Sequence, residues 1–455
     1  MFVRKKRNSS GSVSVQILKK VKGKNILIES VGSSKSDREI EKLVYRAKNK
    51  IKELDPQQEL DLFTSERDRY VSEYIDFNKN IIVTNIGPEL ILGKIFDKIG
   101  LNQIPEELFR HITLARLTYP VSKLKTTEYL LQHHGKEIDV SSIYRFLDRF
   151  HKQYKEEVES IVFHHSKKIL GEIQMVFYDL TTLYFEAEDE DDLRKIGFSK
   201  DGKFQCPQIM VSLLVGEEGY PIAYEIFEGN TFEGHTMIPV IKAMQKKYHL
   251  PQPVVIADSG LLSKKNLEQL QEQGYEFILG ARIKNEKEEI KKEILEKTKD
   301  LEDKQNISII RKDGNRLIVS YSQSRARKDT YNREKGIRKL KKKIGRGKMT
   351  KESINNRGYN KFLVMKGETK VFLDKKKIEQ DKAWDGLKGY ITNSKTLSNT
   401  EVISNYNHLW KIEKAFRISK TDLRIRPIFH RKRDRIEAHL TIAFTAYAIY
   451  KELER

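Results

Sequence analysis

Residues 173–279 limit the possible folds more than any other part of the sequence, because strand-like and helix-like segments alternate along them. Three short apolar segments come first, at residues 174–179, 209–215 and 221–227. Helix, strand, helix and strand patterns then follow one another up to residue 279. Three sequential strands followed by this alternation predict a mixed α/β sheet with helices packed on it.

Two of the predicted strands end in an acidic residue. Asp179 follows the apolar run 175–178, and Asp258 follows the apolar run 254–257. A carboxylate there costs free energy if it is buried without a partner, so it lies in a solvated turn or at a functional site. Ligands gather at the carboxyl ends of strands in a sheet covered on both faces. Because two converging carboxylates suit a hard divalent cation better than they suit each other, the pair predicts a metal site.

A third acid, Glu413, lies in a segment with helical periodicity. One face of this helix would carry an apolar stripe made of Leu409, Ile412, Phe416 and Leu423. Tyr406, Glu413 and Lys420 are spaced by seven residues, so they would follow the edge of the stripe with a drift of about 20° per step. Glu413 would then border the core and reach a site on the sheet. The alternative is a solvent-exposed acid paired with Lys414 or Arg417, and the spacing alone leaves it open.

The chain is strongly basic, with 86 Lys and Arg residues against 65 Asp and Glu and a formal net charge of +21. This excess favours a polyanionic partner, because each phosphate contact releases counterions. A lysine-rich bias that serves solubility would give the same count. Residues 324–351 concentrate the charge, with thirteen Lys or Arg residues against two acids. We interpret this stretch as a clamp for the DNA backbone, and the residues proposed to contact DNA are Arg338, Lys341, Lys342 and Lys343.

A pair of short helical patterns meets at Gly135. The first covers residues 124–133, and the second begins after Asp139. Such a pair matches a helix-turn-helix whose second helix enters a major groove, with Arg145 and Arg149 on its outward side. The same geometry is also an ordinary way to pack a helical domain, so both interpretations stay open.

The remaining composition narrows the class of protein. The single cysteine, Cys206, excludes an internal disulfide and any Cys-based zinc cluster. The first residues contain no signal-peptide pattern, and the longest apolar run, 440–450, is about half the length of a membrane span. We therefore expect a soluble cytoplasmic protein, associated with the nucleoid, that acts on neither a membrane nor a small molecule.

The segments around the three acids resemble the DDE transposases of bacterial insertion sequences, in particular the insertion-sequence-four-like group with a Tyr-Arg-Glu-Lys signature. This signature is Tyr, two residues, Arg, three residues, Glu, six residues and Lys. The chain has Tyr406, Leu409, Glu413 and Lys420 at these positions, so a leucine replaces the arginine. A phosphate contact made by that arginine would pass to Lys411 or Arg417.

The other two acids carry the same resemblance. Residues 178–182, Tyr-Asp-Leu-Thr-Thr, are similar to the family's first motif, Asp-x-Thr. Residues 258–260, Asp-Ser-Gly, are similar to the second motif, in which Gly follows the Asp by two. The stretch 221–230 between them also resembles this group. The resemblance covers about residues 170–455.

This resemblance implies an α/β fold with a ribonuclease H-like mixed-sheet core, interrupted by a β-rich insertion and preceded by a mainly helical N-terminal region. A hairpin at 11–33, a helix at 37–54 and a strand at 80–85 predict a small module at the start. The expected units are this β/α module at 1–85, the helical region with the helix-turn-helix pattern at 86–168, the first part of the core at 169–281, the basic insertion at 282–395 and the C-terminal core helices at 396–455.

The resemblance also implies an activity, namely metal-dependent DNA cleavage and strand transfer by a dimer bound to element ends and target, all double-stranded DNA. Asp179 would bridge two Mg²⁺ ions, which Mn²⁺ could replace, and Asp258 and Glu413 would each hold one. Tyr406 and Lys420 would grip phosphates near the scissile bond. Two alternatives stay open: a ribonuclease H-like nuclease without strand transfer, and an inactive, transposase-derived DNA-binding protein.

Overall fold

The computed structural model describes residues 1–54, 70, 84–261, 263–346, 354–355, 358–366 and 370–455. The chain forms two compact units, Met1–Ile82 and Val83–Arg455, which are described separately. The strand predicted at residues 80–85 lies mostly outside the described residues. In the described part of the chain, no helix combines the length and the apolar character that crossing a membrane requires.

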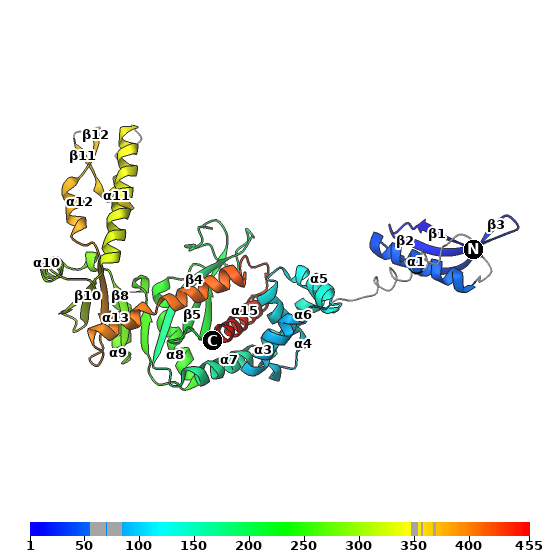
Figure 1. The fold of residues 1–455 in the computed structure, drawn as a ribbon, viewed down its shortest axis with the longest axis horizontal. Helices are drawn as coiled ribbons and strands as arrows, with labels where there is room; N and C mark the ends of the chain where they lie inside the picture. Colours follow the sequence, from blue (N-terminus) through cyan, green and yellow to red (C-terminus); the bar gives the residue numbers. More distant parts are fainter. Residues whose placement is uncertain (55–69, 71–83, 262, 347–353, 356–357, 367–369) are drawn as a thin grey trace. The chain divides into compact units, whose positions relative to one another are not determined.

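The first unit is a three-stranded antiparallel sheet with one helix on it (Figure 1). Val15 and Ile17 of the middle strand are fully buried and pack with Ile40 and Ala47 of the helix. The predicted hairpin and helix are confirmed, whereas the first strand was missed. The elements are β1 (Phe2–Arg7), β2 (Val13–Val21), β3 (Lys24–Ser34) and α1 (Asp37–Leu54).

An eight-stranded sheet organises the second unit, with the strand order β6-β5-β4-β7-β8-β13-β10-β9. Strands β4, β5 and β6 are antiparallel neighbours, and β7 and β8 then continue parallel to β4. This mixed sheet with helices confirms the predicted α/β, ribonuclease H-like fold class. The strands are β4 (Met175–Tyr184), β5 (Gln208–Val215), β6 (Pro221–Glu228), β7 (Val254–Ala257), β8 (Phe277–Ala281), β9 (Asn306–Ile310), β10 (Arg316–Tyr321) and β13 (Leu387–Thr392).

The two faces of the sheet have separate cores because side chains alternate along each strand. On β4, Val176 and Tyr178 join the core beneath α8 (Met237–Tyr248) and α9 (Lys264–Glu272). Phe177 joins the core on the opposite face, beneath the C-terminal helices. These are α13 (Asn399–Asn407), α14 (Trp410–Arg417), the π-helical turn η8 (Ile418–Asp422) and α15 (Arg433–Glu454).

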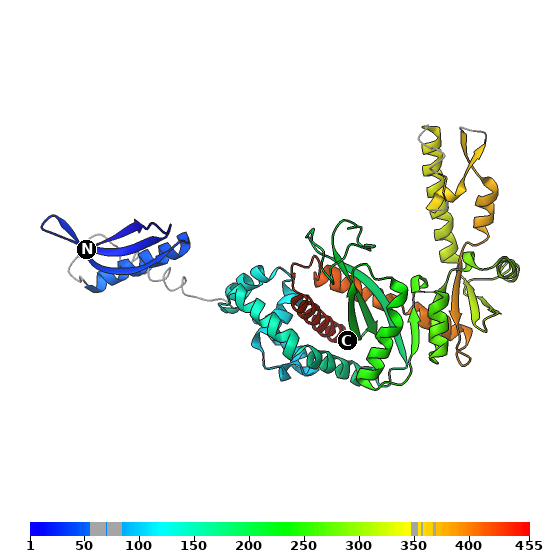
Figure 2. The same ribbon diagram turned by 180° about the vertical axis from the view of Figure 1, so that it is seen from behind.

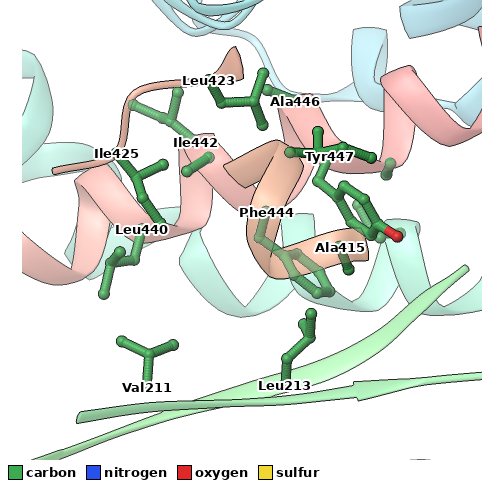
Figure 3. Close-up of a cluster of buried hydrophobic side chains, with 14 of the residues drawn as sticks. Val211, Leu213, Ala415, Leu423, Ile425, Leu440, Ile442, Phe444, Ala446 and Tyr447 are labelled. Carbon is green, nitrogen blue, oxygen red and sulfur yellow. The ribbon is translucent and has the colours of Figure 1, made fainter. Parts of the chain in front are cut away.

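Helix α14 is held against the sheet by a dense apolar cluster. Figure 3 shows Val211 and Leu213 of β5 below Ala415 of α14 and Phe444 of α15. The residues labelled there are all buried. This packing fixes the place of α14 over the sheet, and with it the place of Glu413.

The predicted mainly helical region before the core is present, and it packs around α15 (Figures 1 and 2). Helix α15 is buried around nearly its whole circumference, which is typical of a helix enclosed by others. Its partners include α3, α4, α6 and α7. The bounds of this region are η1 (Glu89–Gly93), α3 (Lys94–Ile99), η2 (Leu101–Gln103), α4 (Glu107–Thr118), α5 (Lys123–His134), α6 (Val140–Gln153) and α7 (Lys155–Leu170).

Residues 282–395, predicted to be β-rich and basic, are closely tied to the core sheet. Strand β13 pairs with β8 and with β10, so β9, β10 and β13 extend that sheet. A separate two-stranded sheet lies beside the long helix α11 in both views (Figures 1 and 2). The other elements here are α10 (Glu288–Lys297), α11 (Gln323–Gly345), β11 (Leu363–Lys366), β12 (Lys370–Leu373) and α12 (Lys375–Lys382).

Candidate active site

Asp179 lies in the middle of β4 and not at its end, so the prediction that it closes its strand is wrong. The strand continues to Tyr184 and stays paired with β5 up to Gln208. The residues after Asp179 include two threonines and a tyrosine, types that favour strands. Asp179 was mistaken for the end of the strand because it interrupts an apolar run. In the structure the strand continues, and the Asp179 side chain lies on one face of the sheet.

Asp258 follows β7 directly, as predicted, and lies next to Asp179. Strands β4 and β7 are parallel and in register, with Tyr178 opposite Ala257. The next residues along the two strands are the two aspartates. A backbone N–H donates to each carboxylate, from Leu180 to Asp179 at 2.7 Å and from Ser259 to Asp258 at 2.6 Å. The structure therefore brings these two acids together.

Negative charge accumulates around Asp179. Burial, together with the carboxylates of Asp258 and Glu233, raises the pKa of Asp179 to about 6. The ammonium group of Lys200 opposes this rise in the pKa. Its Nζ atom lies 4.0 Å from Oδ1 of Asp179 and 3.1 Å from Oε1 of Glu233. Two carboxylates and one ammonium group therefore act on the Asp179 carboxylate.

The helix predicted through Tyr406 and Lys420 is divided into three segments. Helix α13 ends at Asn407, α14 begins at Trp410, and a π-helical turn starts at Ile418. Backbone bonds to the third preceding residue tighten the chain between the first two segments. The prediction of one straight helix with a regular drift at every seventh residue is therefore wrong. Helix α13 contacts β8 and β13, whereas α14 contacts β4 and β5.

Glu413 nevertheless lies over the face of β4 that carries the Asp179 side chain. On this face the Phe177 ring is 6.5 Å from the His408 ring, just before α14. Four residues further along β4, Thr181 lines a small cavity with Phe416 of α14. Asp179 therefore lies between the two contact residues of β4, Phe177 and Thr181. Glu413 lies between their partners, His408 and Phe416. The Glu413 side chain is exposed, and its carboxylate is among the charges that act on Lys388 and Tyr406.

Tyr406 contacts the second acid directly. Its hydroxyl donates a hydrogen bond to Oδ1 of Asp258 at 3.3 Å. Burial and the Asp258 carboxylate raise the pKa of Tyr406. Gly280 of β8 makes room for this contact, since a Cβ atom there would lie 2.4 Å from the tyrosine hydroxyl. The structure gives Tyr406 a positioning contact that spacing alone did not predict.

A further cation, Lys388 of β13, lies over Tyr406. Its Nζ atom is 4.5 Å from the centre of the Tyr406 ring and 5.3 Å from that of Tyr390. Burial and the charge of Arg325 lower the pKa of Lys388, while the carboxylates of Asp258 and Glu413 raise it. Lys388 therefore faces the two acids from the insertion.

Lys420 is engaged by a carboxylate. Its Nζ atom lies 3.2 Å from both oxygens of Asp201, which also pairs with Arg426. Burial lowers the pKa of Lys420, and the neighbouring charge of Lys200 lowers it further. Phosphate contact by Lys420 stays a prediction, and it would require competition with Asp201.

Leu409, which replaces the signature arginine, is buried. Of the two substitutes considered, Lys411 donates to the carbonyl of Glu217 and lies 3.5 Å from the carboxylate of Glu218. Arg417 is exposed and has no ion pair within the residues that the structure covers. A phosphate contact by Arg417 or Lys411 stays a prediction.

The residues predicted to contact DNA all lie on helices. Arg145 and Arg149 are on the exposed side of α6, where Arg145 donates to two serine hydroxyls and Arg149 pairs with Glu106 at 3.0 Å. Helix α11 carries the other four, and no helix had been predicted for these residues from the sequence. These side chains are exposed and lack an ion pair inside the described ranges, and they are Arg338, Lys341, Lys342 and Lys343. Their contacts with DNA stay predictions.

Four residues of the candidate site were not predicted from the sequence, namely Lys200, Glu233, Gly280 and Lys388. Glu233 follows β6 in the short turn η3 (Glu233–His235), and its Oε2 lies 3.8 Å from the position of a Cβ on Gly260. Gly280 was visible as a glycine inside a strand pattern, which often marks a close approach. Lys388 reaches the site only because β13 pairs with β8, a long-range pairing that no local pattern shows.

The family model that describes the transposase DDE domain matches residues 171–449, more than half of the chain. The chain belongs to the transposase DDE domain family. Both aspartates and Glu413 lie within the matched residues. No curated protein matches the chain.

A comparison with solved structures finds similarity to two transposase complexes. The piggyBac transposase synaptic complex with hairpin DNA is 10% identical, with 82% of this chain and 75% of that chain covered and a TM-score of 0.40. The Mos1 transposase paired-end complex with left transposon end is 13% identical, with 50% and 70% covered and a TM-score of 0.18.

Proposed function

We propose that this member of the family is the transposase of a bacterial, insertion-sequence-four-like element that cuts DNA and joins the freed ends to a target. The adjacency of Asp179 on β4 and Asp258 just after the neighbouring parallel strand β7 carries the proposal. Such a pair of carboxylates inside a transposase domain is suited to phosphodiester chemistry with divalent cations.

The carboxylates fit a hard cation chemically. Oxygen ligands are the ones that Mg²⁺ prefers, and the raised pKa of Asp179 reflects burial together with negative charge that a cation would offset. No group of three or more His, Cys, Asp or Glu side chains that could hold a metal ion is found in the part of the chain that the structure describes. Asp179 and Asp258 would hold the metal, and Glu413 remains the proposed third ligand.

When bound, two Mg²⁺ or Mn²⁺ ions would neutralise charge on the attacking and leaving oxygens of the phosphodiester. The protein's own groups prepare this site. Tyr406 orients the Asp258 carboxylate through its hydroxyl, and Lys200 favours the ionised form of Asp179 by opposing the rise in its pKa. In the first reaction water attacks the phosphodiester and a 3′-hydroxyl leaves. In the second reaction that hydroxyl attacks target DNA, and another 3′-oxygen leaves.

DNA would be held largely by its backbone. The exposed cations of α11 would bind phosphates without reading sequence, and Arg145 and Arg149 would contact DNA from α6, the second helix of the predicted helix-turn-helix. Because transposition acts on two element ends, we expect a homodimer on DNA.

The experiment uses a plasmid that carries the coding sequence with its flanking DNA, the purified full chain and Mg²⁺. Cleavage at the flanks and joining to a second plasmid are the expected results, and both should disappear with Asp258→Ala. Cleavage without joining would favour the nuclease alternative. Binding without either reaction, unchanged by Asp258→Ala, would favour the inactive DNA-binding protein.

A further inference from the structure

The first unit carries a strongly basic surface outside the residues that match the family. Residues 1–54 contain fifteen Lys and Arg against five Asp and Glu, and the first 25 residues contain eight basic residues and no acid. Helix α1 covers one face of the sheet through Val15 and Ile17. On the other face, Arg4, Lys6 and Lys20 are exposed, whereas Leu18 is buried.

The pairing register shows which side chains share the open face. Strands β1 and β2 are antiparallel, with Arg4 opposite Gln16 and Lys6 opposite Ser14. Side chains at every second position share a face, so these four lie opposite Val15 and Ile17. Lys20 continues the same side of β2. We call this set, Arg4, Lys6, Ser14, Gln16 and Lys20, the open sheet face.

The open sheet face contains donors and acceptors with few competing partners. The guanidinium of Arg4 donates to Oε1 of Gln16 at 3.1 Å, and both cationic ends of the face, Lys6 and Lys20, are exposed. The ion pair described within this unit joins Lys50 to Glu29, and it uses none of the residues of this face. The positive charge of the face therefore has no carboxylate to balance it among the described residues.

Apolar side chains lie on this face and beside it, since Phe2 and Leu18 share the side of Arg4 and Gln16. Phe2 and Leu27 are 40% and 51% exposed, and both pair with the buried Leu18 between them. Thymine methyl groups offer apolar contacts in the major groove, beside base edges that accept and donate hydrogen bonds. A membrane surface would require a larger apolar area, whereas mixed cations, an amide and these few apolar side chains fit a nucleic acid duplex.

We propose that the open sheet face binds double-stranded DNA as a β-ribbon in the major groove. Lys6 and Lys20 bind phosphates on the two sides, while the Arg4–Gln16 pair faces base edges, because a major groove admits a two-stranded ribbon. This inference deepens the proposed function, on which it rests for its partner. It adds a second DNA-binding surface, separate from α6 and α11.

The test measures binding by the full chain carrying Asp258→Ala, so that catalysis plays no part in the result. A short fluorescein-labelled duplex of random sequence reports affinity by anisotropy over a range of salt concentrations. The test variant is Lys6→Gln with Lys20→Gln. The matched control is Lys42→Gln with Lys48→Gln, which removes the same charge from exposed positions of α1.

The expected result is a salt slope smaller by about 1.8 for the test variant, since each lost phosphate contact removes about 0.9. The control variant should keep the wild-type slope. Equal slopes for the two variants would overturn the proposal, and so would equal competition by an RNA duplex. Circular dichroism confirms that both variants fold.

A selection from a randomised duplex pool tests base reading. The Asp258→Ala chain should enrich a sequence motif that the same chain with Gln16→Ala selects less strictly. Identical motifs from the two chains would overturn the role of the Arg4–Gln16 pair. If DNA binding by this face holds but the plasmid assay shows no strand transfer, the proposed function fails while this surface stands.

Discussion

Replacing Gly280 with alanine tests how the site is positioned without touching an acid. The new Cβ would lie 2.4 Å from the Tyr406 hydroxyl oxygen and 3.1 Å from its Cζ and from the Ser259 nitrogen. An ordinary contact begins near 3.4 Å, so the hydroxyl must withdraw by about 1 Å. Its hydrogen bond to Asp258 is already 3.3 Å long, so this shift breaks it.

The expected magnitude follows from these distances. Overpacking of this kind lowers the free energy of unfolding by about 1–3 kcal/mol. Displacing a group by about 1 Å in an active site costs on the order of 100-fold in rate. We therefore expect Gly280→Ala to lower single-turnover cleavage by 10- to 100-fold, as an order-of-magnitude estimate, while the chain stays folded in thermal unfolding.

A double-variant cycle isolates the cause. Tyr406→Phe removes the oxygen that the new methyl group would meet, so Gly280→Ala should cost much less activity in that background. The rates of the two single variants and the double variant are compared under the same conditions. If Gly280→Ala costs the same activity with and without the hydroxyl, the alanine does not act through Tyr406 and the reasoning fails.

Three further predictions follow from charges in the structure. Lys200→Gln removes the cation that opposes the rise in the pKa of Asp179. Because cleavage needs the ionised carboxylate, the cleavage rate should fall below about pH 6 in the wild type and already at a higher pH in the variant. An acid limb of the pH–rate profile that does not move would contradict this prediction. The Nζ atom of Lys123 is buried without a hydrogen-bond partner among the described residues, and burial and the charge of Arg116 lower its pKa well below 10.5. The unfolded chain therefore binds a proton that the folded chain does not, so stability should rise with pH up to about 10.5. Lys123→Met should stabilise the chain by at least about 1 kcal/mol and flatten this rise in thermal unfolding, and a loss of stability would contradict the prediction. Changing Arg338, Lys341, Lys342 and Lys343 of α11 to Gln should lower the salt slope of DNA binding by up to about 3.6, measured by anisotropy, and an unchanged slope would remove α11 from the DNA surface.

Much of the core could be predicted from local pattern. Helix α1 has the bounds that its sequence predicts, and the strand before Asp258 ends where the apolar run ends. The pairing of Asp179 with Asp258 follows once both lie on parallel neighbours. Local hydrophobic periodicity is enough for these features, because it depends on residues that are close in sequence.

Other features depend on contacts that are distant in sequence. The end of β4 was misplaced because an acid interrupts the apolar run of a strand that cross-strand pairing with β5 continues. Gly280 and Lys388 enter the site through the pairing of β8 with β13, and the step between α13 and α14 follows the sheet beneath them. Glu233 was missed because its short turn has no periodicity to mark it.

The identity of the third acid tests the account most directly. Glu413→Gln and Glu233→Gln remove the same charge from two acids near the aspartate pair, and strand transfer from the plasmid substrate with Mg²⁺ is measured for each. The account predicts that Glu413→Gln abolishes strand transfer as fully as Asp258→Ala does, with no further loss when the two are combined, because residues that act as a unit are not additive. Glu233→Gln should retain joining. Abolition by Glu233→Gln together with activity in Glu413→Gln would contradict the account and assign the third acid to the turn after β6.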